Sequence, residues 1–531
     1  MIEQIATAGI SRRGFLGGAV VAVAGLGLAG CGSQGAPGSG SAAADSYRDE
    51  LNIAIEAMPP TLDTVMTAST ATVDVMANVL EPLFALDASY AAKPVLATGT
   101  EVSDDGLTVK VSLRRGIKFH NGEEMTAEDV AASMNRWLSN GTRAQSLLPG
   151  ASFAATGDAE VTCTLTQPAS DFETVLGMHS QYAGIVPVKS IEAAGEDGLS
   201  EFIGTGAYKL DEVKQDQYIH LVRNDAYAPA DGEPSGFTGH ASAPTKELYY
   251  QIVTDADTRV SGIQTGEYDI ACEIPTESYQ DLSDDGNVKL RKSNGGVLEA
   301  FLNTSTGIMA NEKLRQAVLA AIDAEAVATA AYGEKELFTL DGGFMNPDNE
   351  QWATDAGTDL YNQADAERAK KLLEEAGYAG ETVHLLTTPD YKEMYNATVA
   401  IQDQLESAGF TCEVDSYEFS TFMDVRTSKP DQWDLFVASI SYQVTPAQSL
   451  TVSPDFYALS DEEALKLVAE TRTASTHEEA LEKWGACQKR LYETAATTAL
   501  CHYLSLSATA ADVEGFQSNV GSIVWNAKRP A

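Results

Sequence analysis

Basic residues are scarce in this sequence, and their scarcity excludes two classes of partner. The 531 residues include 35 Lys and Arg against 77 Asp and Glu, which gives a formal net charge of −42. A surface of this charge repels nucleic acid and anionic lipid headgroups, so we expect neither as a direct partner. The acidic residues are spread along the chain rather than gathered in a tail, which is typical of a solvated, soluble surface.

Motifs for catalysis and for metal or cofactor binding are also missing. The seven histidines are scattered, and none pairs with another at metal-ligand spacing. The sequence has no CxxC, no GxSxG, no phosphate loop and no GxGxxG that opens a helix. We interpret Gly204-Thr205-Gly206 as a turn or hinge, because a strand-like segment follows it. We therefore expect no enzyme, no cofactor and no metal site, although a triad of distant residues stays open.

Cysteines are few, and their pairing is left open by the sequence. Five follow Cys31, namely Cys163, Cys272, Cys412, Cys487 and Cys501. An odd number leaves at least one thiol unpaired unless it bonds another chain.

Long apolar runs are absent after residue 31, but the first 31 residues have the features of an export signal. Arg12-Arg13 is followed by an apolar run to Leu28 that is too short and too rich in Gly and Ala for a comfortable membrane span. Ser11 to Leu16 resembles a twin-arginine motif, and Leu28-Ala29-Gly30-Cys31 resembles the bacterial lipobox. The resemblance implies lipidation of Cys31 and cleavage before it; a plain amino-terminal anchor is the alternative. The Gly/Ser/Ala-rich segment 32–45 is expected to be a flexible tether.

Helical and strand patterns alternate in the clearest part of the body, residues 362–417. A helical face over 366–376 ends at Gly377, a strand is expected at 383–386, a second helix ends at Gly409, and a strand follows at 410–414. Such alternation predicts parallel strands with crossover helices and hence an α/β fold. We further expect strands at 51–55 and 108–113, and helices at 126–138, capped by Thr126, and from about 311 to 322.

Several short motifs occur in a fixed order between about residues 50 and 510. They are Pro60-Thr61-Leu62-Asp63, Leu80-Glu81-Pro82-Leu83, Asp104 to Thr108, Leu113 to Gly122, Thr126 to Val130, Gly204 to Tyr208, Arg223 to Tyr227, Ile263 to Asp269, Leu302-Asn303-Thr304, Leu314 to Ala317 and Ala321-Ile322-Asp323. Taken together, this set resembles solute-binding protein family 5, the extracellular receptors of dipeptide, oligopeptide and nickel ABC importers.

The resemblance implies a periplasmic-binding-protein-like fold of type II. It has two α/β lobes joined by a hinge, and an extra third domain. We expect lobe I at 46–84, 201–300 and 509–531, the extra domain at 85–200, and lobe II at 301–508. Chain crossings between the lobes are expected near 201–206 and 300–305, with a return near 508.

The same resemblance implies a lipid-anchored receptor on the extracytoplasmic face of the cell membrane, periplasmic or cell-surface. It would be a monomer that closes around a ligand, with a peptide favoured, and delivers it to ABC permease subunits. A metal chelate or another non-peptide solute is the alternative ligand, and a lipid-anchored enzyme is the alternative class. His120 and Arg315 are tempting ligand groups, but we expect a packed turn for the former and a carboxylate partner for the latter.

One segment departs from the family. Peptide-binding relatives carry an Asp a few residues before a Pro, after a strand like 434–438, and this carboxylate pairs with the peptide α-amino group. Counting back from Pro446 puts Tyr442 at that position. We therefore hypothesise that free dipeptides are not bound through the usual ammonium–carboxylate pair, unless the register is shifted or another acid substitutes from across the cleft. The cleft wall is predicted to comprise Ser439, Ile440, Ser441 and Tyr442, with Ala57, Met58 and Pro59.

Overall fold

The computed structural model describes residues 47–474, 476–519 and 521–531. The predicted export signal, the lipidation site Cys31 and the tether up to residue 45 lie outside these residues. Among the residues described, no helix combines the length and the apolar character that crossing a membrane requires.

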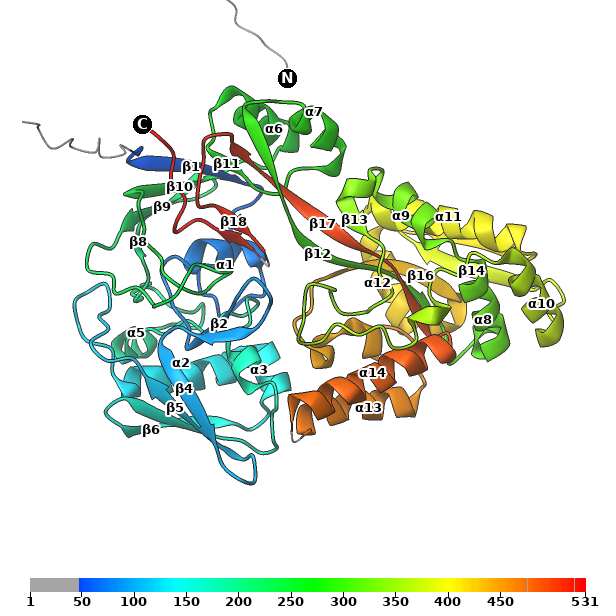
Figure 1. Cartoon of the computed structure of the whole chain (residues 1–531), viewed down its shortest axis with the longest axis horizontal. Helices are drawn as coiled ribbons and strands as arrows, with labels where there is room; N and C mark the ends of the chain where they lie inside the picture. Colours follow the sequence, from blue (N-terminus) through cyan, green and yellow to red (C-terminus); the bar gives the residue numbers. More distant parts are fainter. Residues whose placement is uncertain (1–46, 475, 520) are drawn as a thin grey trace, which may run out of the picture. The chain divides into compact units, whose positions relative to one another are not determined.

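One large mixed sheet runs through the described part of the chain (Figure 1). Its strand order is β15 (Thr411–Ser416), β14 (Thr382–Thr387), β16 (Leu435–Ser441), β12 (Val288–Leu302), β17 (Thr497–Ala510), β11 (Ile270–Ala271), β1 (Glu50–Ile55), β10 (Glu247–Ile252), β9 (Tyr218–Arg223) and β8 (Tyr208–Lys214), with β13 (Phe338–Thr339) paired to β17. β12 and β17 are the two long strands at its centre, and they pair with each other along most of their length.

Buried apolar side chains form separate cores on either side of these central strands. The lobe II core draws on residues 297–501, and the lobe I core on residues 51–95, 182–272 and 510–527. A smaller cluster comprises Ala54 and apolar residues between 263 and 508, and it includes Val288 at the start of β12. A further core, that of the extra domain, draws on residues 65–185. The structure is thus the two-lobed α/β fold of type II that we expected, with an added domain.

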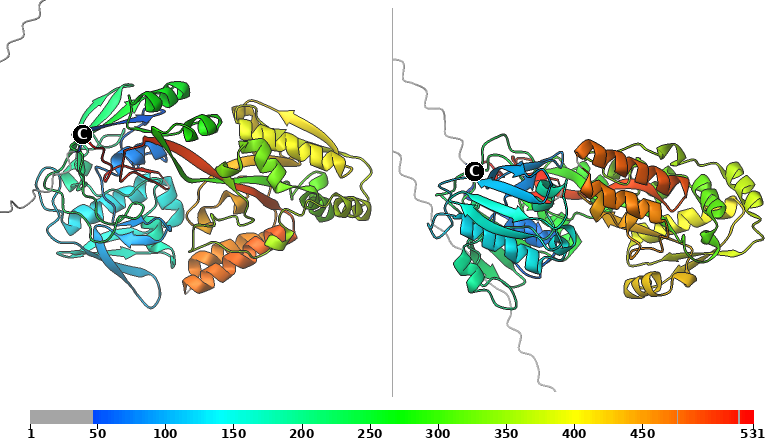
Figure 2. Two further views of the ribbon diagram at one scale, coloured as in Figure 1. Left: turned by 45° about the horizontal axis from the view of Figure 1, so that its top comes forward. Right: turned by 90° about the horizontal axis from the view of Figure 1, so that it is seen from below.

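Helices cover the lobe II part of the sheet on both sides. α9 (Ala324–Tyr332) and α11 (Lys392–Ser407) pack together on one side, and α13 (Glu462–Thr473) and α14 (His477–Glu493) on the other (Figures 1 and 2). The remaining helices of lobe II are α8 (Glu312–Ala321), α10 (Ala366–Ala376) and α12 (Phe419–Ser428).

Lobe I and the extra domain contain shorter elements. The extra domain has a four-stranded antiparallel sheet in the order β4 (Ala97–Val102), β5 (Thr108–Leu113), β7 (Glu160–Thr164) and β6 (Ser152–Gly157), with α2 (Ala127–Asn140), α3 (Thr142–Leu147), α4 (Phe172–Leu176) and α5 (Val188–Glu192). The other short elements are α1 (Thr70–Met76), α6 (Ala256–Thr265), α7 (Tyr279–Ser283), β2 (Phe84–Leu86), β3 (Ala92–Pro94), β18 (Gln517–Ser518) and β19 (Ser522–Ile523).

Local sequence signals explain several of these boundaries. The Thr126 hydroxyl accepts a hydrogen bond from the Asp129 amide, and the Asp129 carboxylate accepts one from the Thr126 amide, so α2 begins with a capping box. Gly377 ends α10 with a φ of 72°, a left-handed conformation that glycine adopts without strain. β14 and β15 are parallel, with α11 between them along the chain. The α/β unit predicted at 362–417 is therefore confirmed.

The crossings between the lobes lie in β12 and β17. Segment 201–206, which we expected to cross, instead connects the extra domain to lobe I: the Gly204 carbonyl accepts from the His120 backbone, and the Gly206 amide donates to Val79. Along β12, Val288 pairs with Ala510, and Val297 already pairs with Ile440 of lobe II. The lobe limits that we predicted near 300 and 508 fall within these strands and stay a prediction.

Candidate ligand-binding site

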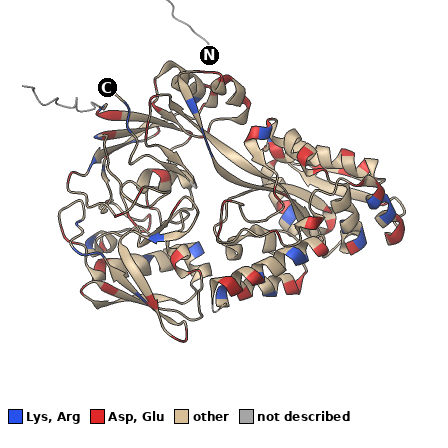
Figure 3. Ribbon diagram, in the orientation of Figure 1, with Lys and Arg blue, Asp and Glu red and all other residues tan. Residues whose placement is uncertain are grey.

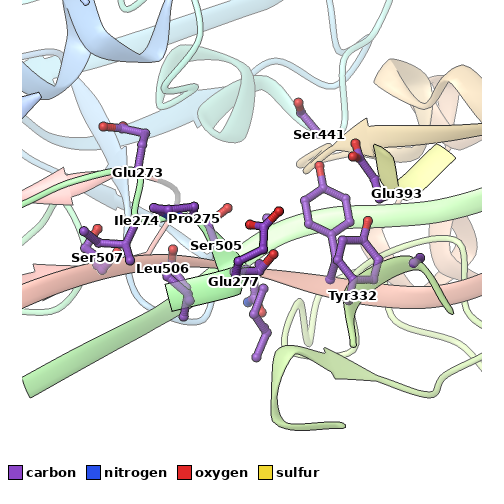
Figure 4. A pocket seen from close by; sticks show the side chains of 18 of the residues that line it. Glu273, Ile274, Pro275, Glu277, Tyr332, Glu393, Ser441, Ser505, Leu506 and Ser507 are labelled. Atoms are coloured by element: carbon purple, nitrogen blue, oxygen red, sulfur yellow. The ribbon is translucent and has the colours of Figure 1, made fainter. Parts of the chain in front are cut away.

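A cavity of about 950 Å³ lies beside the crossing strands and is lined by both lobes. Lobe I contributes residues from α1, from 273–280 and from 518–522, and lobe II contributes residues from 330–334, 390–396 and 441–442. β12 and β17 form its floor with residues 293–295 and 503–507. Figure 4 shows side chains from the two walls facing this space. Its volume suits a small organic ligand, and its place suits a site that changes when the lobes move.

The end of β16 brings part of the predicted cleft wall to this cavity. Ser441 and Tyr442 line it. Side chains alternate along a strand, so Ser439 shares the face of Ser441 whereas Ile440 points the other way and is buried in the lobe II core. The Ser439 hydroxyl donates to Glu393 at 3.2 Å, which connects it to the cavity wall.

Tyr442 is held in place by its own neighbours. Its ring stacks on Tyr90 with 4.4 Å between centroids, and its hydroxyl accepts from the Asn349 side chain at 2.7 Å. The hydroxyl supplies no negative charge, because burial raises its pKa well above the usual value. Any cationic group of a ligand therefore needs a carboxylate from another element.

Ala57, Met58 and Pro59 lie apart from this cavity's lining. Ala57 is exposed, Met58 packs against the lobe I core, and Pro59 is buried. Their predicted role in ligand binding stays a prediction.

Glu393 on α11 lies beside two tyrosines of the cavity. The rings of Tyr332 and Tyr503 stack with 5.5 Å between centroids and 16° between planes. Burial raises the pKa of both hydroxyls, and the Glu393 carboxylate raises it further in each case. The Ser439 hydroxyl lies between Tyr332 and this carboxylate, 3.5 Å from the Tyr332 hydroxyl and 3.2 Å from Glu393 Oε1.

Asp74 and Glu273 place a pair of carboxylates on the lobe I wall. Asp74 on α1 is 8% exposed, and its Oδ1 lies 3.0 Å from Nε2 of His179. Glu273 borders the open cavity and remains exposed there, yet the surrounding protein removes enough water to raise its pKa to about 7. The neighbouring carboxylates Asp74 and Glu56 raise that pKa further.

His120 and Arg315 do not take part in this site. The His120 ring is fixed by Gly206 and Gly204: Nε2 donates to the Gly206 carbonyl at 3.0 Å, and Nδ1 accepts from the Gly204 amide at 3.2 Å. Arg315 donates to three backbone carbonyls, those of Met309, Ala310 and Thr494. It forms no ion pair with a carboxylate in the described part of the chain, so the carboxylate partner that we expected was wrong.

We next consider metal ligands and cysteines within the described ranges. Residues 47–474, 476–519 and 521–531 contain no group of three or more His, Cys, Asp or Glu side chains placed to hold a metal ion. The five cysteines that follow residue 31 are all free, and four of them are buried.

Sequence reasoning missed the carboxylates of this cavity. They come from α1, from the loop after β11, from the loop after α9, and from α11 and the loop before it, which are far apart in the sequence. One signal was available: β1 and β11 are parallel, so Glu56 and Glu273, which follow them closely, lie at the same edge of the sheet. Nothing comparable marks Glu393, which is one of many acidic residues on exposed helices (Figure 3).

Comparison with known proteins agrees with this architecture. Residues 91–456 match the model of the bacterial extracellular solute-binding proteins, family 5 Middle. The "Probable peptide ABC transporter periplasmic-binding protein y4tO" of Sinorhizobium fredii is 28% identical over 388 residues, which cover 68% of this chain and 70% of that protein. The oligopeptide-binding protein AppA of Bacillus subtilis is 23% identical over 514 residues and 89% of each chain.

Solved structures share the fold. The substrate-binding protein CtaP of Listeria monocytogenes superimposes with a TM-score of 0.78 at 20% identity, over 92% of this chain and all of that one. The family match, the curated relatives and the shared two-lobed fold define a substrate-binding receptor of ABC-transporter type rather than an enzyme. The chain belongs to family 5 of the bacterial extracellular solute-binding proteins.

Proposed function

We propose that this receptor captures peptides outside the cytoplasm and delivers them to an ABC importer. The observation that carries the proposal is the cavity between the lobes, because a ligand that touches both walls favours the arrangement in which the walls are close. Relatives and structural neighbours support the ligand class. They include glutathione-binding proteins of Salmonella at 28% identity, and a DppA of Helicobacter pylori in complex with the peptide STSA.

Calorimetry on the full-length chain in detergent tests the ligand class. A synthetic mixture of tripeptides should bind with micromolar or tighter affinity, and mass spectrometry should recover the peptides uncleaved. Binding of a metal chelate or a sugar acid in the absence of any peptide binding would favour the alternative ligand. Cleavage of the peptides would favour an enzyme.

We further propose that the protein is anchored by lipid on Cys31. The motif Leu28-Ala29-Gly30-Cys31 supports this, because lipidation at such a cysteine would retain an exported protein at the membrane surface. Cys31→Ser should leave the chain unprocessed or release it into the medium, as followed by membrane fractionation and intact mass. Wild type and variant that are equally processed and equally membrane-bound would contradict the anchor.

A further inference from the structure

The charges that line the cavity are almost all negative. Six carboxylates line it, those of Asp74, Glu273, Glu277, Glu334, Asp390 and Glu393, against a single basic side chain, Lys392. Lys392 already lies 3.2 Å from Glu277 across the cavity. In the described part of the chain, none of the other five carboxylates forms a salt bridge with Lys or Arg.

Glu393 and its two tyrosines form the first place where a cation fits. The Glu393 carboxylate and the Tyr332 hydroxyl both contact the Ser439 hydroxyl, and the Tyr332 ring stacks on Tyr503. A carboxylate next to aromatic rings that line the same cavity offers Coulomb and cation–π attraction to an ammonium or guanidinium group. Figure 4 shows Glu393, Tyr332 and Ser441 together on the lobe II side. Ser439 donates to Glu393 Oε1 and so orients the carboxylate.

Asp74 and Glu273 form the second place, on the lobe I wall. Asp74 is more than nine-tenths buried and lines the cavity, and its Oδ1 is the oxygen that contacts His179. Among the described residues, no side chain of Lys or Arg pairs with this carboxylate, so His179 is its one side-chain partner there. In the view of Figure 4, Glu273 lies on the side opposite Glu393, with Glu277 between them. The two places are therefore separate and belong to different lobes.

We propose that the cavity selects peptides with two cationic groups: a free α-ammonium together with a Lys or Arg side chain. One cation lies against Glu393, Tyr332 and Tyr503, and the other lies against Asp74 and Glu273. Closure around a neutral peptide removes water from these carboxylates without supplying partners for them. A dicationic peptide instead supplies one cation to the carboxylates of each wall. This inference rests on the proposed peptide-receptor function, since it names the class of peptide.

The test is calorimetry on the full-length chain in detergent with matched tripeptides. The probes are Ala-Ala-Ala, Ala-Glu-Ala and the three tripeptides with one Lys and two Ala. At least one Lys peptide should bind tenfold or more tightly than Ala-Ala-Ala, and Ala-Glu-Ala should bind more weakly than both. Glu393→Gln and Glu273→Gln should each reduce the preference for Lys at least fivefold, with melting temperatures that show folded protein.

Asp403→Asn is the matched control, because Asp403 is exposed on the same helix as Glu393 and lies outside the cavity. It should keep the full preference for Lys. Equal affinity for all five peptides, or an unchanged preference in both Gln variants, would overturn the inference and leave the peptide receptor intact. Binding of 1,5-diaminopentane with no peptide binding would overturn the peptide function but retain the selection of dications. Failure of both the Lys peptides and the diamine to bind would overturn the inference.

Discussion

At the scale of single residues, several polar side chains of this protein serve the fold rather than the ligand. His120 holds the Gly204–Gly206 segment, and burial together with the nearby Lys209 lowers its pKa to about 4. The ring therefore stays neutral at physiological pH. Arg315 joins the start of its own helix to the end of α14 through the Thr494 carbonyl. Both residues attracted attention in the sequence as ligand groups, and the partners of both are backbone atoms.

Glu299 is the buried acid from which we predict a pH effect on stability. It has no exposed surface, and it accepts from the Thr451 and Thr497 hydroxyls at 2.9 and 2.7 Å. Burial raises its pKa from 4.5 to about 8, so the folded protein favours the neutral acid. Its contribution to stability is complete below pH 4.5 and is lost as the pH rises through about 8.

Glu299→Gln replaces the acid by a neutral group of the same shape and should remove this loss. Measured by thermal unfolding at pH 5, 7 and 9, the midpoint of the variant relative to wild type should rise with pH. The comparison between the two proteins cancels the titration of all other groups. A constant difference across this range would show that Glu299 is already charged in the folded state.

At the scale of elements, the crossing strand β12 depends on two glycines. The pairing of β12 with β17 is irregular between Asn294 and Gly296, where the strand passes from one lobe to the other. A Cβ on Gly296 would lie 1.9 Å from the Ile440 carbonyl oxygen, and one on Gly295 would lie 2.4 Å from the Tyr503 ring. The absence of side chains here lets β16 and Tyr503 approach β12 and so shapes the cavity floor.

Gly296→Ala should destabilise the protein by about 1–3 kcal/mol, because the new methyl group forces β12 and β16 apart. It should also weaken peptide binding, since Ser441 pairs with Gly296 at the cavity. The free energy of unfolding in urea and calorimetry measure the two effects. Gly286→Ala is the control: its Cβ would meet nothing within 4 Å, so we expect a change within about 0.5 kcal/mol. Equal stability of the two variants would contradict this account of the crossing.

The same elements show how much of the fold and of the candidate site could be predicted from the sequence alone. The helices and strands of 366–416 were predictable, because apolar spacing and glycine stops act locally. The crossing strands were not, since long-range pairing rather than local pattern sets where β12 changes partners. The family resemblance put Ser441 and Tyr442 in the predicted cleft wall, and both line the cavity, while their role in ligand binding stays a prediction. Glu393 and Asp74 could not be found, because only the fold brings acids from different helices to one cavity.

At the scale of the whole molecule, lobe II is joined to the rest of the chain not only by the two crossing strands but also by contacts with the extra domain. The ring of Tyr90, which follows β2 in the chain, stacks on the ring of Tyr442. The Tyr90 hydroxyl accepts a hydrogen bond from the Asn294 side chain at 2.9 Å. Ser170 donates to the Thr471 carbonyl at 2.9 Å, and Arg472 lies 3.5 Å from Asp171. A movement of lobe II against the rest of the chain must break or rearrange such contacts, whereas the cores of the lobes can stay intact.

The central claim is that ligand draws the two lobes together around the cavity. Small-angle X-ray scattering on the full-length chain in detergent, with contrast-matched micelles, tests it most directly. We predict that the radius of gyration falls when the protein is saturated with the tripeptide that calorimetry ranks as tightest. An unchanged scattering profile at a peptide concentration that calorimetry shows to be saturating would contradict the claim.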